Sequence, residues 1–162
     1  MRIKILRTVS LFILLTIYPI HLFSQEENHH NHHHHTELGI ANSMVLLGHE
    51  QEWAYGLHLH LIRNIGHSNF GLGLGYERIF DDHGHNSIGI VGSYSPVDGL
   101  HLNLAPGLAF EDGEFSEAKP ALHIETSYGF RIGNSHIGPL WELAFDSQRY
   151  HMSFGLHIGL AL

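Results

Sequence analysis

The stretch WAYGLHLHL at residues 53–61 alternates a bulky apolar side chain with alanine, glycine or histidine. Successive side chains of a β-strand point to opposite faces, so this strand has one bulky apolar face and one face of small residues and imidazoles. A strand that is half in a dry core and half in water usually has Thr, Ser, Lys or Glu on its wet face, and this stretch has none. Any fold proposed for the chain must explain that second face.

The same alternation recurs along the chain, and connections rich in Gly, Asn, Asp, Ser or Pro separate the segments. This pattern predicts eight antiparallel strands joined in an up-and-down order. The predicted strands are residues 37–47, 53–63, 70–80, 87–95, 100–111, 121–131, 137–146 and 150–162.

The bulky face fits lipid better than a protein core. A soluble barrel would carry hydrated chains outside, yet one lysine follows residue 24, and the second face is dominated by glycine. Glycine weakens an exposed strand but leaves room inside a narrow barrel. In lipid, a closed sheet satisfies every backbone hydrogen bond. The sequence therefore predicts an all-β, eight-stranded antiparallel up-and-down transmembrane β-barrel over residues 37–162, with a β-bulge expected at Pro106.

The first 24 residues have a different composition. Arg2, Lys4 and Arg7 precede an apolar run of about 13 residues, shorter than the roughly 20 that a transmembrane helix needs. We predict a cleaved signal peptide at 1–24 and a disordered histidine-rich segment at 25–36. The chain has no cysteine, which excludes a lipid-anchored lipoprotein, disulfides and thiolate metal sites.

Beyond residue 24, five basic residues face sixteen acidic ones, a net charge of −11 with histidine neutral. Such a charge argues against nucleic acid as a partner.

The alternating strands, ending in YHMSFGLHIGLAL at 150–162, resemble the small eight-stranded outer membrane β-barrel proteins of Gram-negative bacteria. The resemblance covers residues 36–162. It implies an outer-membrane location, contact with outer-membrane lipid, and both termini in the periplasm. It includes no catalytic motif.

Histidine is the most abnormal entry in the composition, with 18 residues. The side-chain alternation directs many histidines and acids into the lumen. The residues expected in its outward half are His123, Glu125, Glu142, His151, Glu77, Glu111 and Asp146. Such a group suits Zn²⁺, Cu²⁺ or Ni²⁺. The alternative is a hydrogen-bonded polar filling, which the narrow interior of eight strands favours. The other residues expected in the lumen are His58, His60, His101, His157 and Arg131.

A second group of histidines follows the predicted cleavage site and comprises His29, His30, His32, His33, His34 and His35. A flexible run of this kind can wrap several neutral imidazoles around one divalent ion, with moderate affinity and little choice of metal. Protonation near the ordinary imidazole pKa of about 6.5 would release the ion. A solvated linker and an expression tag are the alternatives. The interrupting Asn31 and the intact signal argue against the tag.

A third group lies in the connection DDHGH, where His83 and His85 adjoin Asp81 and Asp82. These residues can chelate a metal, although a charged exterior loop is the more ordinary interpretation. Under the predicted topology this loop is extracellular, whereas the N-terminal tract is periplasmic.

An enzyme must be weighed against these binding sites. His151 and Ser153 form an H-x-S pattern that resembles the outer-membrane lipid A deacylases. A hydrolase of that kind would need a carboxylate to orient the histidine, and no acid follows Ser153. Both residues are also expected to face the lumen. We therefore predict no enzymatic activity.

The sequence favours an outer-membrane barrel that binds Zn²⁺, Cu²⁺ or Ni²⁺ in metal capture or homeostasis at the envelope, with an envelope metal transporter as a possible partner. Three alternatives stay open. They are a structural barrel with incidental histidines, a lipid A deacylase-like membrane hydrolase, and a soluble ligand-binding barrel of the lipocalin type.

Overall fold

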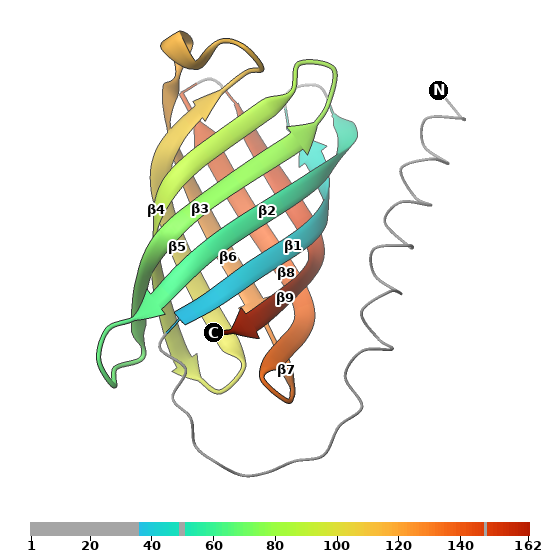
Figure 1. Ribbon diagram of the computed structural model, residues 1–162. Coiled ribbons are helices and arrows are strands. Elements are labelled where there is room, and N and C mark those ends of the chain that lie inside the picture. The colour runs from blue at the N-terminus through green and yellow to red at the C-terminus, as the bar shows by residue number, and fades with distance from the viewer. Residues whose placement is uncertain (1–35, 49–50, 148) are drawn as a thin grey trace.

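The computed structural model describes residues 36–48, 51–147 and 149–162, which form one antiparallel sheet (Figure 1). The predicted signal peptide and the tract at His29–His35 lie outside the described residues. Thr36, assigned from sequence to the preceding segment, is the first residue of the first strand. The strands are β1 Thr36–Leu47, β2 Glu52–Asn64, β3 Phe70–Phe80, β4 His85–Val97, β5 Leu100–Phe110, β6 Lys119–Tyr128, β7 Phe130–Ile132, β8 Ser135–Asp146 and β9 Tyr150–Ala161.

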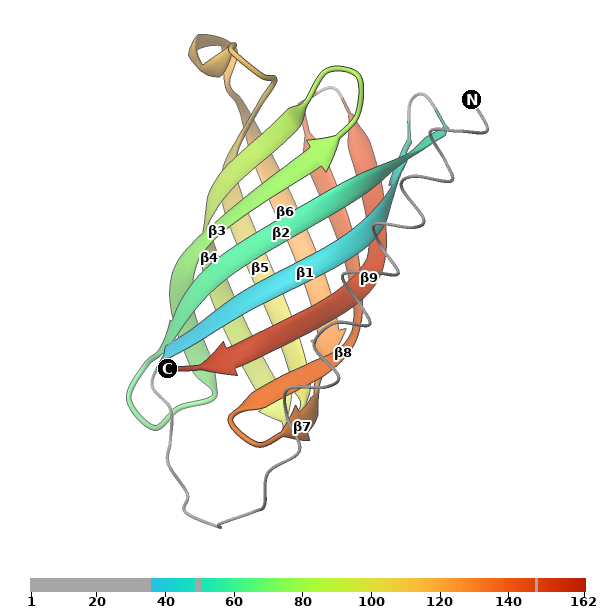
Figure 2. The ribbon, with the colours of Figure 1, turned by 45° about the vertical axis from the view of Figure 1, so that its right-hand side comes forward.

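The sheet closes on itself as an eight-stranded barrel. Each strand from β1 to β5 pairs with the next in sequence, β8 pairs with β9, and β1 pairs with both β2 and β9 along its length (Figure 2). β6 and β7 both pair with β8 and act as one barrel strand interrupted at Gly129. The eight strands and their up-and-down order are therefore as predicted.

One end of the barrel holds the two ends of the described chain, and the other holds the longest of the connections between strands (Figure 1). Thr36 and Leu162 lie together at the first end, and Leu162 N donates a hydrogen bond to Thr36 O (Figure 1). We call this the terminal end. The opposite end carries the β3–β4 connection and the β5–β6 connection with its short 3₁₀ helix, η2 Phe115–Glu117, and we call it the loop end. Among the described residues, no helix has the length and apolar character needed to cross a membrane.

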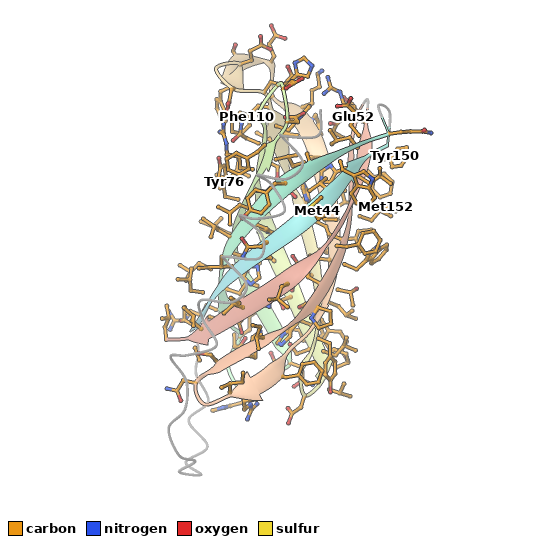
Figure 3. All side chains as sticks on the ribbon, turned by 90° about the vertical axis from the view of Figure 1, so that its right-hand side faces the viewer. Met44, Glu52, Tyr76, Phe110, Tyr150 and Met152 are labelled. Atoms are coloured by element: carbon orange, nitrogen blue, oxygen red, sulfur yellow. The ribbon has the colours of Figure 1, made fainter. Side chains whose placement is uncertain are left out.

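The outward side chains form the apolar face predicted from the alternation. Leu72, Leu74 and Ile90 are each more than half exposed around the middle of the wall. Sticks project outward around the barrel in Figure 3, with Tyr76 and Tyr150 labelled near the loop end. An exposed apolar surface of this kind is stable where the surrounding solvent is hydrocarbon.

One polar pair interrupts this apolar face. Asn42 points outward but is buried, because the Tyr55 hydroxyl donates a hydrogen bond to Asn42 Oδ1 and the Tyr55 ring packs 5.5 Å from the Phe80 ring centroid. The tyrosine thus covers a polar group that would otherwise meet lipid.

The lumen contains two small apolar clusters beside its polar residues. Val45, Ala54 and Ile79 form one, and Ile62, Val91 and Ala105 form the other. These side chains fill the interior around the histidines, as expected for a barrel of this circumference.

The expected bulge at Pro106 is wrong. The β4–β5 register is the same at Gly89↔Gly107 and at Gly92↔Leu104, so the chain passes Pro106 without an extra residue. Proline has no N–H to donate, so β4 and β5 lose their pairing around Pro106, but the register on either side of it stays the same. The irregularity lies between Tyr94 and Val97 near the terminal end.

Candidate metal centre

Four lumen side chains from four separate strands meet in the half of the barrel nearer the loop end. Glu77 comes from β3, His123 from β6, Glu142 from β8 and His151 from β9, and one ligand atom from each lies within 4.8 Å of all the others. We call this group the loop-end cluster. Each residue has inward parity on its strand, so the alternation that exposes apolar chains to lipid also directs these groups to the barrel axis.

The distances within the loop-end cluster match a tetrahedral metal site. His123 Nδ1 lies 3.4 Å from Glu142 Oε1 and 3.6 Å from Glu77 Oε2. His151 Nε2 lies 3.3 Å from Glu77 Oε2 and 3.6 Å from Glu142 Oε1. Two ligands about 2.0–2.1 Å from one zinc ion at tetrahedral angles are about 3.4 Å apart. Four of the six ligand-to-ligand distances in this group are therefore close to the value that a tetrahedral site requires.

The burial of these atoms adds to this argument. Glu142 is 1% exposed and Glu77 is 4% exposed. Glu142 Oε1 and His151 Nε2 are buried and have no hydrogen-bond partner among the described residues. Buried polar atoms without partners are rare and costly, and a bound ion is one way of satisfying them.

A cavity of about 40 Å³ opens from the loop-end cluster toward the loop end. Its lining includes Glu77, His123 and His151 below, with His85 and Arg149 above. One water needs about 10–15 Å³ of such space, so the cavity can hold an ion together with a water ligand.

Charged residues close the mouth above this cavity. Arg149 Nη2 donates to Glu111 Oε1 at 2.9 Å, and Arg149 Nη1 donates to His85 Nε2. His85 Nδ1 lies 2.5 Å from Asp81 Oδ2.

Asp81 also orders the β3–β4 turn. Its Oδ1 accepts hydrogen bonds from Gly84 N at 2.7 Å and His85 N at 3.2 Å. Burial raises the pKa of Asp81, but the charge of His85 and the hydrogen bonds from His85 and Gly84 outweigh burial and lower the pKa below its ordinary 3.8.

Glu125 lies beside the loop-end cluster and outside it. Its Oε1 accepts a hydrogen bond from Asn103 Nδ2 at 2.7 Å, and its Oε2 lies 3.0 Å from His58 Nδ1. His58 Nδ1 is also 3.4 Å from Glu142 Oε2, so His58 connects the two carboxylates.

The predicted ligands thus separate into four sets, of which Glu125 beside the loop-end cluster is one. His123, Glu142 and His151 come together as expected. His83 is exposed, and its ring lies 6.2 Å from that of His85, whose two nitrogens face Asp81 and Arg149. The tract residues His29, His30, His32, His33, His34 and His35 lie outside the described residues.

Several other lumen expectations need comment. His60, His101 and His157 face the lumen in the terminal half. Arg131 of β7 pairs with His136, so it lies on the lumen face as expected, although its side chain is exposed. Asp146 Oδ1 accepts a hydrogen bond from Arg149 N in the β8–β9 turn.

Sequence reasoning did not single out Glu37 and His136, which also face the lumen. Both residues have inward parity. His136 was missed because its strand was predicted to begin at residue 137, and Glu37 because the first strand was the weakest of the eight.

Neither a known protein family nor a curated protein matches the sequence. Solved structures do match. Neisserial surface protein A (NspA) superposes with a TM-score of 0.56 at 11% identity, over 78% of this chain and 96% of that chain. A designed transmembrane β-barrel gives 0.55 at 12% identity, over 76% and 95%. Ail, the attachment invasion locus protein of Yersinia pestis, gives 0.50 at 13% identity, over 77% and 95%.

The chain has the fold of the small outer-membrane β-barrels. At such low identity the likeness concerns the arrangement of strands alone and assigns no role to any side chain of the loop-end cluster. The chemistry of this barrel must be argued from its own residues.

Proposed function

We propose that this protein lies in the outer membrane and binds a divalent transition metal ion, Zn²⁺, Cu²⁺ or Ni²⁺, in its lumen. The ligands are Glu77, His123, Glu142 and His151, and the role is metal capture or homeostasis at the envelope. The observation that carries the proposal is the set of four ligand-to-ligand distances of 3.3–3.6 Å.

The charge of the loop-end cluster suits a divalent ion. Two carboxylates buried together in a low-dielectric interior repel each other and need compensating positive charge. A divalent cation neutralises both at once, and two neutral imidazoles complete the shell without adding charge. Two histidines and two carboxylates form a tetrahedral set of the kind that zinc accepts.

The N-terminal histidine tract would act as the capturing element. Its six imidazoles are followed in sequence by Thr36, which begins β1 at the terminal end. The tract would concentrate metal ions near the barrel. An envelope metal transporter is the partner that would receive or supply these ions.

A structural barrel is the second candidate. Each histidine of the loop-end cluster lies within 4 Å of a carboxylate, so protonated imidazoles could satisfy the acids without metal. In this case the histidines and glutamates form an ion-paired core. The two candidates differ in whether the protein binds metal at stoichiometric amounts.

We also propose that the protein is not a lipid hydrolase. Ser153 is 1% exposed and faces the lumen opposite Glu142, away from the hydrocarbon. A lipid substrate would have to cross the barrel wall to reach it. Incubation with lipopolysaccharide tests this proposal, and acyl release that Ser153→Ala abolishes would overturn it.

The metal proposal is tested by calorimetric titration of Zn²⁺ into full-length protein refolded in detergent. All six tract histidines are first replaced by asparagine, so that the lumen is measured alone. We expect Glu142→Gln to weaken lumen binding at least about tenfold, since even the loss of a supporting residue around a metal costs that much. Glu52→Gln, an exposed carboxylate at the same end, is the matched control and should bind as the parent does.

Retained β-sheet circular dichroism verifies the fold of each variant. Equal Zn²⁺ affinity in Glu142→Gln and its parent would remove the loop-end cluster as a metal site and favour the structural barrel.

A further inference from the structure

The terminal half of the lumen holds a second group of imidazoles. Four rings stack in series there, with centroid distances of 5.1 Å for His60–His157, 5.1 Å for His136–His157 and 4.9 Å for His101–His136. Glu37 Oε1 lies 3.7 Å from His60 Nε2 and 3.8 Å from His136 Nε2. We call these five residues the terminal histidine cluster.

The ring nitrogens at the centre of this cluster are unsatisfied. His157 is 2% exposed, and neither of its nitrogens has a hydrogen-bond partner among the described residues. His136 Nε2 is buried and lacks one as well. Ligand atoms of Glu37, His136 and His157 lie within 4.8 Å of one another. Buried lone pairs therefore point toward one small volume beside a carboxylate.

Glycines hold two of these rings in place. His60 lies across from Gly39 on β1, and His136 lies across from Gly159 on β9. In each pair a Cβ on the glycine would overlap the imidazole. The rings thus occupy space that any larger residue would fill, so the ligands are positioned before an ion arrives.

We propose that the terminal histidine cluster is a second, separate transition-metal site, with Glu37, His136 and His157 as ligands. The proposal rests on the metal-binding function proposed above. The Glu37–His136 distance of 3.8 Å must shorten by a few tenths of an ångström to reach the tetrahedral edge of about 3.4 Å, and the His157 nitrogen starts within 4.8 Å of both.

The ligand sets of the two sites differ in chemistry. The terminal site is imidazole-rich with one carboxylate, whereas the loop-end cluster has two of each. Imidazole favours Cu²⁺, Ni²⁺ and Zn²⁺, whereas carboxylates also suit harder ions such as Mn²⁺. The terminal site should therefore discriminate more strongly against Mn²⁺.

His58 lies between the two sites. Its ring meets that of His60 edge-on at 5.6 Å, and its Nδ1 faces Glu125 and Glu142. Glu37 follows His35, the last residue of the tract, by two positions. An ion captured by the tract would thus encounter the terminal site before the loop-end cluster.

The test counts ions in the full-length protein with the tract histidines replaced by asparagine. We expect two Zn²⁺ per barrel in this parent, one after His136→Asn with His157→Asn, and one after Glu77→Gln with Glu142→Gln. If the terminal pair of changes leaves the count unchanged, the terminal site is overturned and the proposed function stands. If the loop-end pair leaves it unchanged, the proposed function fails.

Cu²⁺ provides a readout that a structural role would not produce. In the variant lacking the loop-end acids, pulsed electron paramagnetic resonance should detect at least two imidazoles on one Cu²⁺, and this signal should disappear with His157→Asn. Should the histidine variants fail to fold, Gly159→Ala displaces His136 without removing a ligand and should also abolish the signal. A signal unchanged by Gly159→Ala in that case would overturn the proposal.

Discussion

His136 on β8 lies directly opposite Gly159 on β9, and its imidazole occupies the space where a side chain at residue 159 would begin. His60 and Gly39 have the same relationship on β2 and β1. In these two pairs the glycine and the histidine on one strand face have a common cause, since each of the two rings needs a neighbour without a side chain.

Gly159→Ala should displace the His136 ring while leaving the barrel folded. The atoms that the new Cβ meets belong to a side chain and not to the backbone, so the ring can move without shifting the strand. We expect Zn²⁺ stoichiometry to fall by one, with the free energy of unfolding within about 1 kcal/mol of the parent value. Urea titration and metal counting on the same sample measure both quantities. A large loss of stability with full metal binding would contradict this explanation.

Gly155→Ala should have the opposite outcome. Its Cβ would overlap the backbone carbonyl of Asn42 and approach Ser43 Cα at 2.8 Å, and the backbone of β1 cannot turn aside. We expect the free energy of unfolding to fall by about 1–3 kcal/mol, the usual range for overpacking. Gly92→Ala is the matched control, because the nearest atom to its Cβ is 3.7 Å away. Equal urea midpoints for the two variants would refute the prediction.

The β3–β4 turn should loosen in acid. The folded-state pKa of Asp81 lies below its ordinary 3.8, so its stabilisation is complete above that value and is lost as the pH falls through the lower folded-state value. Hydrogen exchange of the Gly84 and His85 amides, which donate to Asp81, should then accelerate relative to intrinsic rates. Asp81→Asn keeps an acceptor oxygen but cannot titrate, so its protection should not change over this range.

Arg149→Gln should speed the entry of Zn²⁺ into the lumen. The arginine places a positive charge over the cavity and links His85 to Glu111 across the mouth. Its loss should raise the association rate by about tenfold at low salt, and less at high salt where charges are screened. Arg78→Gln is the control, because Arg78 pairs with Asp112, outside the cavity lining. Stopped-flow mixing with a zinc indicator measures both rates, and equal rates would exclude a gating role.

Much of the barrel could be predicted because a strand repeats every two residues. The segment at 70–80 was predicted with the same bounds that β3 has, and its exposed Leu72 and Leu74 alternate with glycines as expected. Pro106 shows the limit of such reasoning. Whether a proline shifts the register or only removes hydrogen bonds depends on the partner strand.

The sequence alone determined which side chains face lipid and which face the lumen, because that choice follows from local alternation and the mismatch between bulky apolar chains and a narrow interior. It also placed His123, Glu142 and His151 inside. Glu77, Glu111, Glu125 and Asp146 were expected in the same half. Only the closed barrel decided that Glu77 and not the other three joins that group, and that Glu37 joins His136 and His157. The tilt and stagger of all the strands together determine which residues lie at the same level along the barrel axis. Spacing along the chain does not encode that level.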